Sequence, residues 1–218
     1  MMEMTLEETE VRILGALIEK ELTTPEYYPL TLNSLTNACN QKSNRDPVMT
    51  LGEEDIVRGL DKLKIKGFAR HSAEGSRVPK YCHSLGERLA PQELAIIAEL
   101  LLRGPQTLGE LRTRGSRMAE FPDIASVEET IKELQQFEPP FVTLLQRQAG
   151  QKEQRYAHLL SGEPHITITE HNPAPEAARL KVMAENERIT KLEEEISLLK
   201  AEVDKLKKVV KEFKAQFE

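Results

Sequence analysis

The stretch Leu6–Ile18, LEETEVRILGALI, recurs at a constant offset as Leu89–Leu101, LAPQELAIIAELL. Both copies place apolar residues at positions i, i+1, i+4 and i+5, which form one face of an amphipathic helix. Two further pairs of blocks repeat in the same order: Ile56–Leu63 with Val127–Leu134, and Lys80–His83 with Arg155–His158. Three aligned blocks in one order indicate two tandem copies of one fold.

Each copy is expected to run through three helices and then a hairpin. The expected helices cover 5–20, 31–41 and 52–66, and then 91–103, 107–114 and 126–137. The expected strands cover 68–72 and 77–83, and then 141–148 and 154–160. Thr31 and Ser126 are expected to cap helices at the N-terminal end and Gly67 at the C-terminal end. Three helices closed by a hairpin are the winged helix-turn-helix arrangement, with the third helix as recognition helix and the hairpin as wing.

The sequence therefore predicts a mainly α protein with small β-hairpins, built from tandem winged helix-turn-helix domains and a C-terminal coiled-coil helix. The predicted parts are winged-helix domains at 1–88 and 89–160, a proline-containing linker at 161–177 and the coiled-coil helix at 178–218.

The C-terminal region carries an unbroken heptad pattern. Spacings of three and four alternate through Ile189, Leu192, Ile196, Leu199, Val203, Leu206, Val210 and Phe213. Ile or Val at most a positions with Leu at most d positions favours a parallel two-stranded coiled coil. The three g–e pairs are attractive: Arg188 with Glu193, Glu195 with Lys200, and Glu202 with Lys207. We expect a homodimer, and the alternative is a helix that packs back on its own domain.

Composition limits the class of protein. The 218 residues carry a net charge of −6 and include two cysteines. No apolar run is long enough to span a membrane, and Met1–Met4 does not begin a signal peptide. We expect a cytoplasmic chain without a disulfide framework. The charge is spread as −2, −3 and −1 over 1–88, 89–163 and 164–218, so a global basic field for nucleic acid is absent.

Two long motifs carry a family resemblance. Thr23–Asn33, TTPEYYPLTLN, is followed by Ala38–Met49, ACNQKSNRDPVM, and a second motif is Leu101–Arg112, LLRGPQTLGELR. Together they resemble the YceH-like family of uncharacterised bacterial proteins over about residues 5–163. The resemblance implies tandem winged-helix domains and implies no known activity.

Catalytic and metal-binding patterns are missing from the sequence. It contains no GxSxG, P-loop, HExxH or CxxC motif. His83 and His158 occupy equivalent repeat positions, which a shared fold explains better than two active sites. Cys82 and His83 are adjacent on a strand and point to opposite faces, so they cannot both chelate one ion without distortion. We expect no enzyme activity, no cofactor and no metal.

Basic residues gather in the predicted wings and helix-connecting loops, where this fold meets phosphates. The candidates for nucleic-acid contact are Lys42, Arg45, Arg58, Lys62, Arg77, Lys80, Arg112, Arg114, Arg117, Lys152 and Arg155. The polar segment Asn37–Pro47 has two interpretations: a surface that recognises bases, or local capping and loop satisfaction.

The predicted recognition helices begin with acidic residues, at Glu53–Asp55 and Glu128–Glu129. Acidic residues suit the helix dipole but repel phosphates. Two functions therefore compete. The first, which the usual use of the fold and the basic wings and loops favour, is binding of double-stranded DNA in a regulatory protein. The other is a protein-interaction scaffold, similar to the tandem winged-helix accessory subunit of bacterial condensin.

Overall fold

The structure is a computed structural model that describes residues 5–72, 78–146 and 153–164. These residues belong to one compact unit, Met1–Ile166. Six α-helices are described: α1 (Glu8–Thr23), α2 (Leu32–Cys39), α3 (Glu53–Ile65), α4 (Pro91–Arg103), α5 (Leu108–Gly115) and α6 (Ile124–Gln136). Five short strands are described: β1 (Leu30–Thr31), β2 (Ala69–His71), β3 (Lys80–His83), β4 (Val142–Leu144) and β5 (Tyr156–His158). The expected mainly helical chain with small antiparallel strand pairs is confirmed. We call α1–α3 with β1–β3 the first half, and α4–α6 with β4 and β5 the second half.

Local signals set most helix ends. The Thr31 side chain caps α2 by accepting a hydrogen bond from the Ser34 amide at 3.3 Å. Gly67 follows α3 at φ 77°, a conformation that glycine adopts without a steric cost. The expected cap at Ser126 is wrong, because α6 begins earlier. Asp123 caps it by accepting from the Ser126 amide at 2.8 Å.

Both sheets are small and antiparallel. In the first half the strand order is β1-β3-β2, with Leu30 opposite Tyr81 and Ala69 opposite His83. The two-residue strand β1 was not expected, because so short a stretch has no alternating pattern. In the second half β4 pairs with β5, and Gln106 bridges to Tyr156 where β1 would lie. The two halves thus repeat one plan, with a single bridge in place of the third strand.

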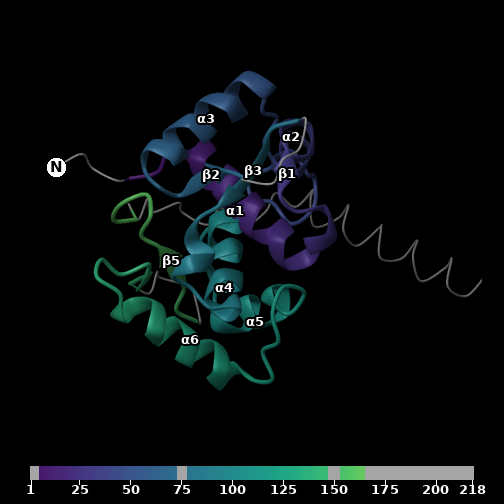
Figure 1. Cartoon of the computed structure of the whole chain (residues 1–218). Coiled ribbons are helices and arrows are strands. Elements are labelled where there is room, and N and C mark those ends of the chain that lie inside the picture. Colours follow the sequence, from purple (N-terminus) through teal and green to yellow (C-terminus); the bar gives the residue numbers. More distant parts are fainter. Residues whose placement is uncertain (1–4, 73–77, 147–152, 165–218) are drawn as a thin grey trace, which may run out of the picture. The chain divides into compact units, whose positions relative to one another are not determined.

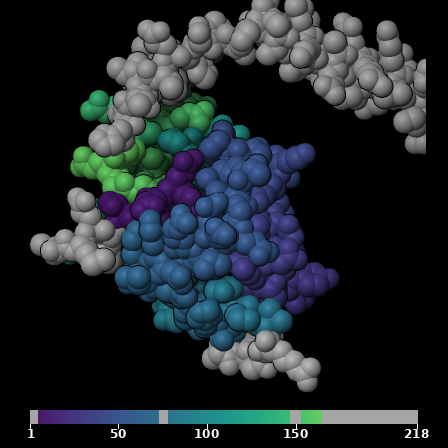
Figure 2. Space-filling model, turned by 90° about the horizontal axis from the view of Figure 1, so that it is seen from above, coloured from purple at the N-terminus to yellow at the C-terminus, as the bar shows by residue number. Residues whose placement is uncertain are grey.

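The centre of the unit is the packing of α1 along α4, the first helix of each half (Figure 1). Figure 1 shows α3 above this pair and α6 below it, so the third helices lie at opposite ends. Figure 2 looks onto the α3 end, where first-half residues, purple to blue, make up most of the described surface. Gly15 allows the close approach of the two helices. A Cβ at this position would lie 2.9 Å from Leu102 Cγ and 3.0 Å from Leu101 Cβ.

One hydrophobic core runs through both halves. It includes fully buried Ile13 and Leu17 of α1, Leu60 of α3, Ile96 of α4 and Ile131 of α6. The predicted domain boundaries at 88 and 160 remain a prediction. The predicted coiled-coil helix lies outside the described residues, as do the eight heptad residues named for it.

Candidate interaction surface

The polar segment Asn37–Pro47 serves the fold along much of its length. The Asn40 side chain exchanges two 2.8 Å hydrogen bonds with the backbone of Leu51, one to its amide and one to its carbonyl. Asn44 adopts a φ of 58°, and its Oδ1 accepts a hydrogen bond from Arg103 of α4. The interpretation as loop satisfaction therefore fits these amides. Lys42 and Ser43 in the same segment are exposed.

Arg45, predicted to contact nucleic acid at the surface, is buried inside the protein. Its side chain is fully buried, and its Nη2 and Nη1 donate to the two carboxylate oxygens of Glu19 at 2.5 and 3.0 Å. It also donates to the Ala38 carbonyl. Burial alone would raise the pKa of Glu19, but the bonds from Arg45 and Arg117 outweigh it and lower the pKa. The expected phosphate contact at Arg45 is wrong, because the guanidinium is enclosed and already paired.

Arg117 extends this pairing into an ion cluster. Its Nη2 lies 2.7 Å from Glu19 Oε1 and 2.9 Å from Glu99 Oε1. Arg103 Nε in turn lies 3.1 Å from Glu99 Oε2. Both carboxylates are buried, with side-chain exposures of 1% for Glu19 and 0% for Glu99. The cluster of Glu19, Arg45, Glu99, Arg103 and Arg117 joins the two halves at the α1–α4 packing.

The other described cations predicted in the second half also have intramolecular partners. Arg112 donates to the carbonyls of Phe121 and Pro122 at 3.3 and 2.6 Å. Arg114 donates to Gln106 Oε1 at 2.8 Å. Arg155 pairs with Glu110 at 2.9 Å and donates to the Pro105 carbonyl. These side chains brace loops and helix ends, so part of the donor capacity of each guanidinium is used within the chain.

The first half retains a few cations at its surface. Lys62 of α3 pairs with Glu7 at 2.6 Å, and Lys80 on β3 is half-buried. Lys42 and Arg58 are exposed and make no ion pair with a described residue. Arg77 and Lys152 of the predicted wings lie outside the described residues. The structure thus does not gather the predicted cations into one basic face within the described ranges.

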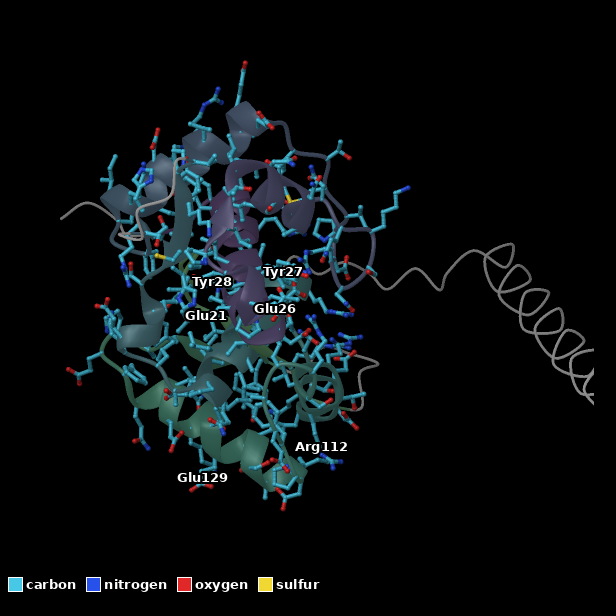
Figure 3. All side chains as sticks on the ribbon, turned by 45° about the vertical axis from the view of Figure 1, so that its right-hand side comes forward. Glu21, Glu26, Tyr27, Tyr28, Arg112 and Glu129 are labelled. Atoms are coloured by element: carbon cyan, nitrogen blue, oxygen red, sulfur yellow. The ribbon has the colours of Figure 1, made fainter. Side chains whose placement is uncertain are left out.

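The solvent faces of the third helices combine acidic and apolar side chains. On α3, Glu54 and Asp61 are exposed beside Val57 and Ile65, and Ile65 is 75% exposed. On α6 the exposed residues include Glu129, Glu133 and Ile124, the last 49% exposed. Figure 3 shows Glu129 on the outer side of α6. Lys132 of α6 is paired with Glu128 at 2.8 Å.

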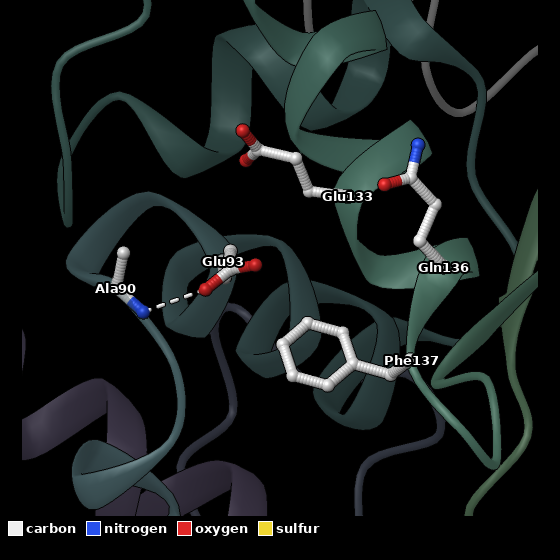
Figure 4. A pocket seen from close by; sticks show the side chains of 5 residues that line it. All are labelled: Ala90, Glu93, Glu133, Gln136 and Phe137. Carbon is white, nitrogen blue, oxygen red and sulfur yellow. Dashed lines mark hydrogen bonds between the residues drawn. The ribbon is translucent and has the colours of Figure 1, made fainter.

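A groove of about 440 Å³ lies between the start of α4 and the end of α6. Its lining residues are Ala90, Glu93, Glu133, Gln136 and Phe137. Figure 4 shows Glu93 on the α4 side, Glu133 and Gln136 on the α6 side, and the Phe137 ring at the end of α6. The groove is not evident from the sequence alone, because its residues come together only when α6 packs on α4.

The first family motif has a structural role around Tyr28 (Figure 3). The Tyr28 hydroxyl accepts a hydrogen bond from the His83 backbone amide at 2.8 Å, which ties the segment between α1 and β1 to β3. Burial raises the pKa of Tyr28. His83 Nδ1 accepts from the Leu85 amide, and its Nε2 contacts Glu21 Oε2. Next to them, Tyr27 is 73% exposed.

Within the part of the chain that the structure describes, no group of three His, Cys, Asp or Glu side chains is placed to hold a metal ion. Among the same residues, no helix has the length and apolar character needed to cross a membrane.

Comparisons with known proteins agree with each other. The model of DUF480, described as a protein of unknown function, matches residues 6–151. A UPF0502 protein of Geotalea uraniireducens is 67% identical over the whole of both chains, and one of Geobacter sulfurreducens is 62% identical over the same extent. A UPF0502 protein of Citrifermentans bemidjiense is 52% identical over 99% of this chain and 100% of its own.

Proposed function

The chain belongs to the DUF480 family of proteins of unknown function, and on that premise we propose that it is a non-catalytic, cytoplasmic protein-binding module. We propose that each half is a winged-helix domain. In support, three helices precede an antiparallel strand pair in each half, and β1 or its single-bridge counterpart joins that pair. The helices α3 and α6 then stand where this fold places its recognition helix.

The observation that carries this proposal is the surface of α3 and α6. Affinity for nucleic acid comes largely from lysine and arginine side chains that neutralise phosphates. On these two helices the exposed acidic residues outnumber the exposed cations, and Arg58 is the one exposed cation that lacks an ion pair among the described residues. Exposed Val57 and Ile65 add apolar area of the kind found at protein interfaces. A protein partner with basic and apolar side chains complements this surface better than a duplex does.

The test is site-specific photo-crosslinking of the full-length chain in living cells. A benzophenone side chain replaces Ile65 of α3, and in a matched control it replaces exposed Glu153, which lies on neither third helix. We expect a protein adduct of one mass from the Ile65 position alone. The captured protein, once purified, should bind the wild-type chain and lose affinity for Ile65→Asp. Absence of a protein adduct at Ile65, or binding that Ile65→Asp leaves unchanged, would overturn the proposal.

Binding of double-stranded DNA is the second candidate. It is favoured by Lys42 and Arg58 of the first half, which are exposed and form no ion pair with a described residue. With Arg77 and Lys80 of the predicted wing they would contact phosphates. In a fluorescence anisotropy titration at low salt, this hypothesis predicts duplex binding that weakens steeply with salt. Arg58→Glu and Lys80→Glu should then reduce the affinity, while Lys132→Glu on α6 should not. Binding with this pattern would favour DNA over a protein partner.

We also propose that the module acts as a homodimer through the helix predicted at 178–218. The support is the heptad of Ile, Leu and Val with its three attractive g–e pairs. A dimer presents each binding surface twice, which raises the avidity for a partner that is itself dimeric or repetitive.

A further inference from the structure

The repeat allows the two halves to be compared position by position. Glu10 of α1 and Glu93 of α4 are equivalent in the aligned repeat, and each accepts a hydrogen bond from a backbone amide three residues before it. Leu63 of α3 aligns with Leu134 of α6. The same offset aligns Lys66 with Phe137.

In the first half, the Glu10 carboxylate binds the ammonium group of Lys66, a residue of the same chain. Lys66 Nζ lies 2.8 Å from both carboxylate oxygens of Glu10 and 2.8 Å from the Thr5 carbonyl. The Glu10 side chain is 1% exposed and that of Lys66 is 16% exposed. A neighbouring pair, Lys62 with Glu7, lies nearer the solvent. The fold at this place therefore accommodates a lysine head group against a buried carboxylate.

In the second half the carboxylate is kept and the lysine is missing. Glu93 is 7% exposed, and its Oε2 accepts from the Ala90 amide at 2.7 Å. Its Oε1 accepts no hydrogen bond from a described residue, and the side chain lines the groove. Phe137 occupies the position of Lys66, and its ring packs edge-on against Phe141 at 5.2 Å. Both Glu93 and Phe137, the residues aligned with Glu10 and Lys66, line the groove.

A second position also differs between the two halves, and there the sign of the charge is reversed. Glu133 takes the position of Lys62, so a carboxylate replaces a cation. Neither Glu93 nor Glu133 forms an ion pair with a described residue. Arg88 also forms none, and it lies over the Phe141 ring at 5.6 Å from the centroid. The groove thus offers the Gln136 amide, an aromatic ring and two carboxylates that form no ion pair within the described part of the chain (Figure 4).

We infer that the α4–α6 groove binds a lysine side chain supplied by a partner protein. Glu93 Oε1 and Glu133 receive the ammonium group, as Glu10 receives that of Lys66. The Phe137 ring contacts the methylene stem. Two carboxylates and an aromatic ring match a cation on an apolar stem better than they match an anion or an uncharged chain. The inference rests on the proposed function in taking the lysine from a protein.

The first experiment tests the groove without a partner. The isotopically labelled full-length chain is titrated with N-acetyl-lysine methylamide and followed by amide NMR. N-acetyl-norleucine methylamide, which has a similar stem and no charge, is the matched probe. We expect saturable shifts at Ala90, Glu93 and Phe137 with the lysine probe alone. No saturable shift, or equal shifts with the norleucine probe, would overturn the inference.

Variants locate the binding in the groove. Glu93→Gln keeps an oxygen that can cap α4, and Glu133→Gln is on the solvent side. Each should weaken binding of the lysine probe by about tenfold, the loss expected for one charge-assisted hydrogen bond. Phe137→Lys places a lysine where the first half has Lys66. Its ammonium group should pair with Glu93 and so prevent the probe from binding. Glu26→Gln, which removes an exposed carboxylate outside the groove, should leave the affinity unchanged. Unchanged affinity in both Glu93→Gln and Glu133→Gln would place the probe elsewhere and overturn the inference.

A second arm asks whether the lysine comes from a protein. A benzophenone at Gln136, beside the groove, is photo-crosslinked in living cells in the wild-type and Glu133→Gln backgrounds. We expect a protein adduct that Glu133→Gln reduces. Probe binding without such an adduct would show a site for small amines and overturn the assignment to a protein. Because the NMR titration does not involve α3, its failure is distinguishable from failure of the proposed function.

Discussion

Arg117 Nη2 lies 2.7 Å from Glu19 Oε1, although Glu19 belongs to α1 and Arg117 follows α5 in the second half. The same guanidinium contacts Glu99 of α4, and Arg45 donates to both carboxylate oxygens of Glu19. Arginines that the sequence offers as contacts for nucleic acid therefore hold the two halves to each other. Buried charges that depend on one another in this way make each member sensitive to the loss of its partner.

Arg45→Ala should destabilise the fold strongly. It leaves the Glu19 carboxylate buried with Arg117 as its remaining strong partner, and breaking a buried pair costs about 3–5 kcal/mol of unfolding free energy. Urea denaturation followed by circular dichroism measures the change. Arg58→Ala, at an exposed cation of α3, is the control and should stay within about 0.5 kcal/mol of the wild type. A loss below about 1 kcal/mol at Arg45 would contradict the account of the cluster, because exposed ion pairs contribute no more than that.

Gly15→Val should separate α1 from α4. A Cβ at this position already lies 2.9 Å from Leu102 Cγ, so a branched side chain forces the helices apart. Overpacking of this kind costs about 1–3 kcal/mol. Gly109→Ala on α5 is the matched control, because its nearest neighbour is 4.0 Å away. That change should stabilise the chain by up to about 1 kcal/mol through helix propensity. Thermal unfolding of both variants checks the prediction, and a stabilised Gly15→Val would refute the close packing.

His158 should make stability depend on pH. Burial lowers its pKa from 6.5 to about 4, and its Nδ1 has no hydrogen-bond partner among the described residues. Below pH 6.5 His158 becomes protonated in the unfolded chain, whereas in the folded chain it stays neutral until the pH nears 4. The contribution of this neutral imidazole is therefore complete above pH 6.5 and is lost as the pH falls towards 4.

The measurement is the free energy of unfolding of the wild type and of His158→Gln at several pH values from 7 to 4. The difference between them should shift by about 1–3 kcal/mol over that range, in the direction that favours the variant in acid. His71→Gln, at an exposed histidine of β2, is the matched control. A difference that does not change with pH would contradict the burial of a neutral imidazole.

Leu199→Asp with Leu206→Asp should convert a dimer into a monomer. Both residues occupy d positions of the heptad, where a charge cannot be buried without a large cost. Light scattering of the wild type should give twice the chain mass of 24.7 kDa, and the variant should give that mass once. Glu194→Lys, outside the a/d seam, should remain dimeric. A monomeric wild type at micromolar concentration would refute the coiled-coil dimer.

Much of the described fold follows from local signals. The helix predicted over 91–103 is observed as α4, Pro91–Arg103, and Gly104 follows its end. Thr31 likewise begins α2 through a short-range hydrogen bond, and Gly67 follows α3 with a backbone geometry that suits glycine. These interactions involve residues a few positions apart, so they are visible in the sequence.

The candidate sites were harder to predict because they depend on contacts between distant residues. Arg45 and Glu19 are 26 positions apart, and the arginine becomes buried only when the loop after α2 docks on α1. Glu99 joins through the packing of α4 on α1, which the amphipathic pattern of each helix does not specify. The groove beside Glu93 had one sequence signal, the exchange of Lys66 for Phe137 between aligned repeats. That exchange acquires meaning only once Lys66 is seen on Glu10.

The packing of α1 along α4 also bears on genetic dissection of the protein. A deletion that removes either half exposes the leucines and isoleucines of the remaining first helix to water, so the fragment should be cleared by proteases. A null phenotype from such a truncation would report the loss of the whole protein. Single surface substitutions, with protein abundance measured beside the phenotype, are the informative alleles for this chain.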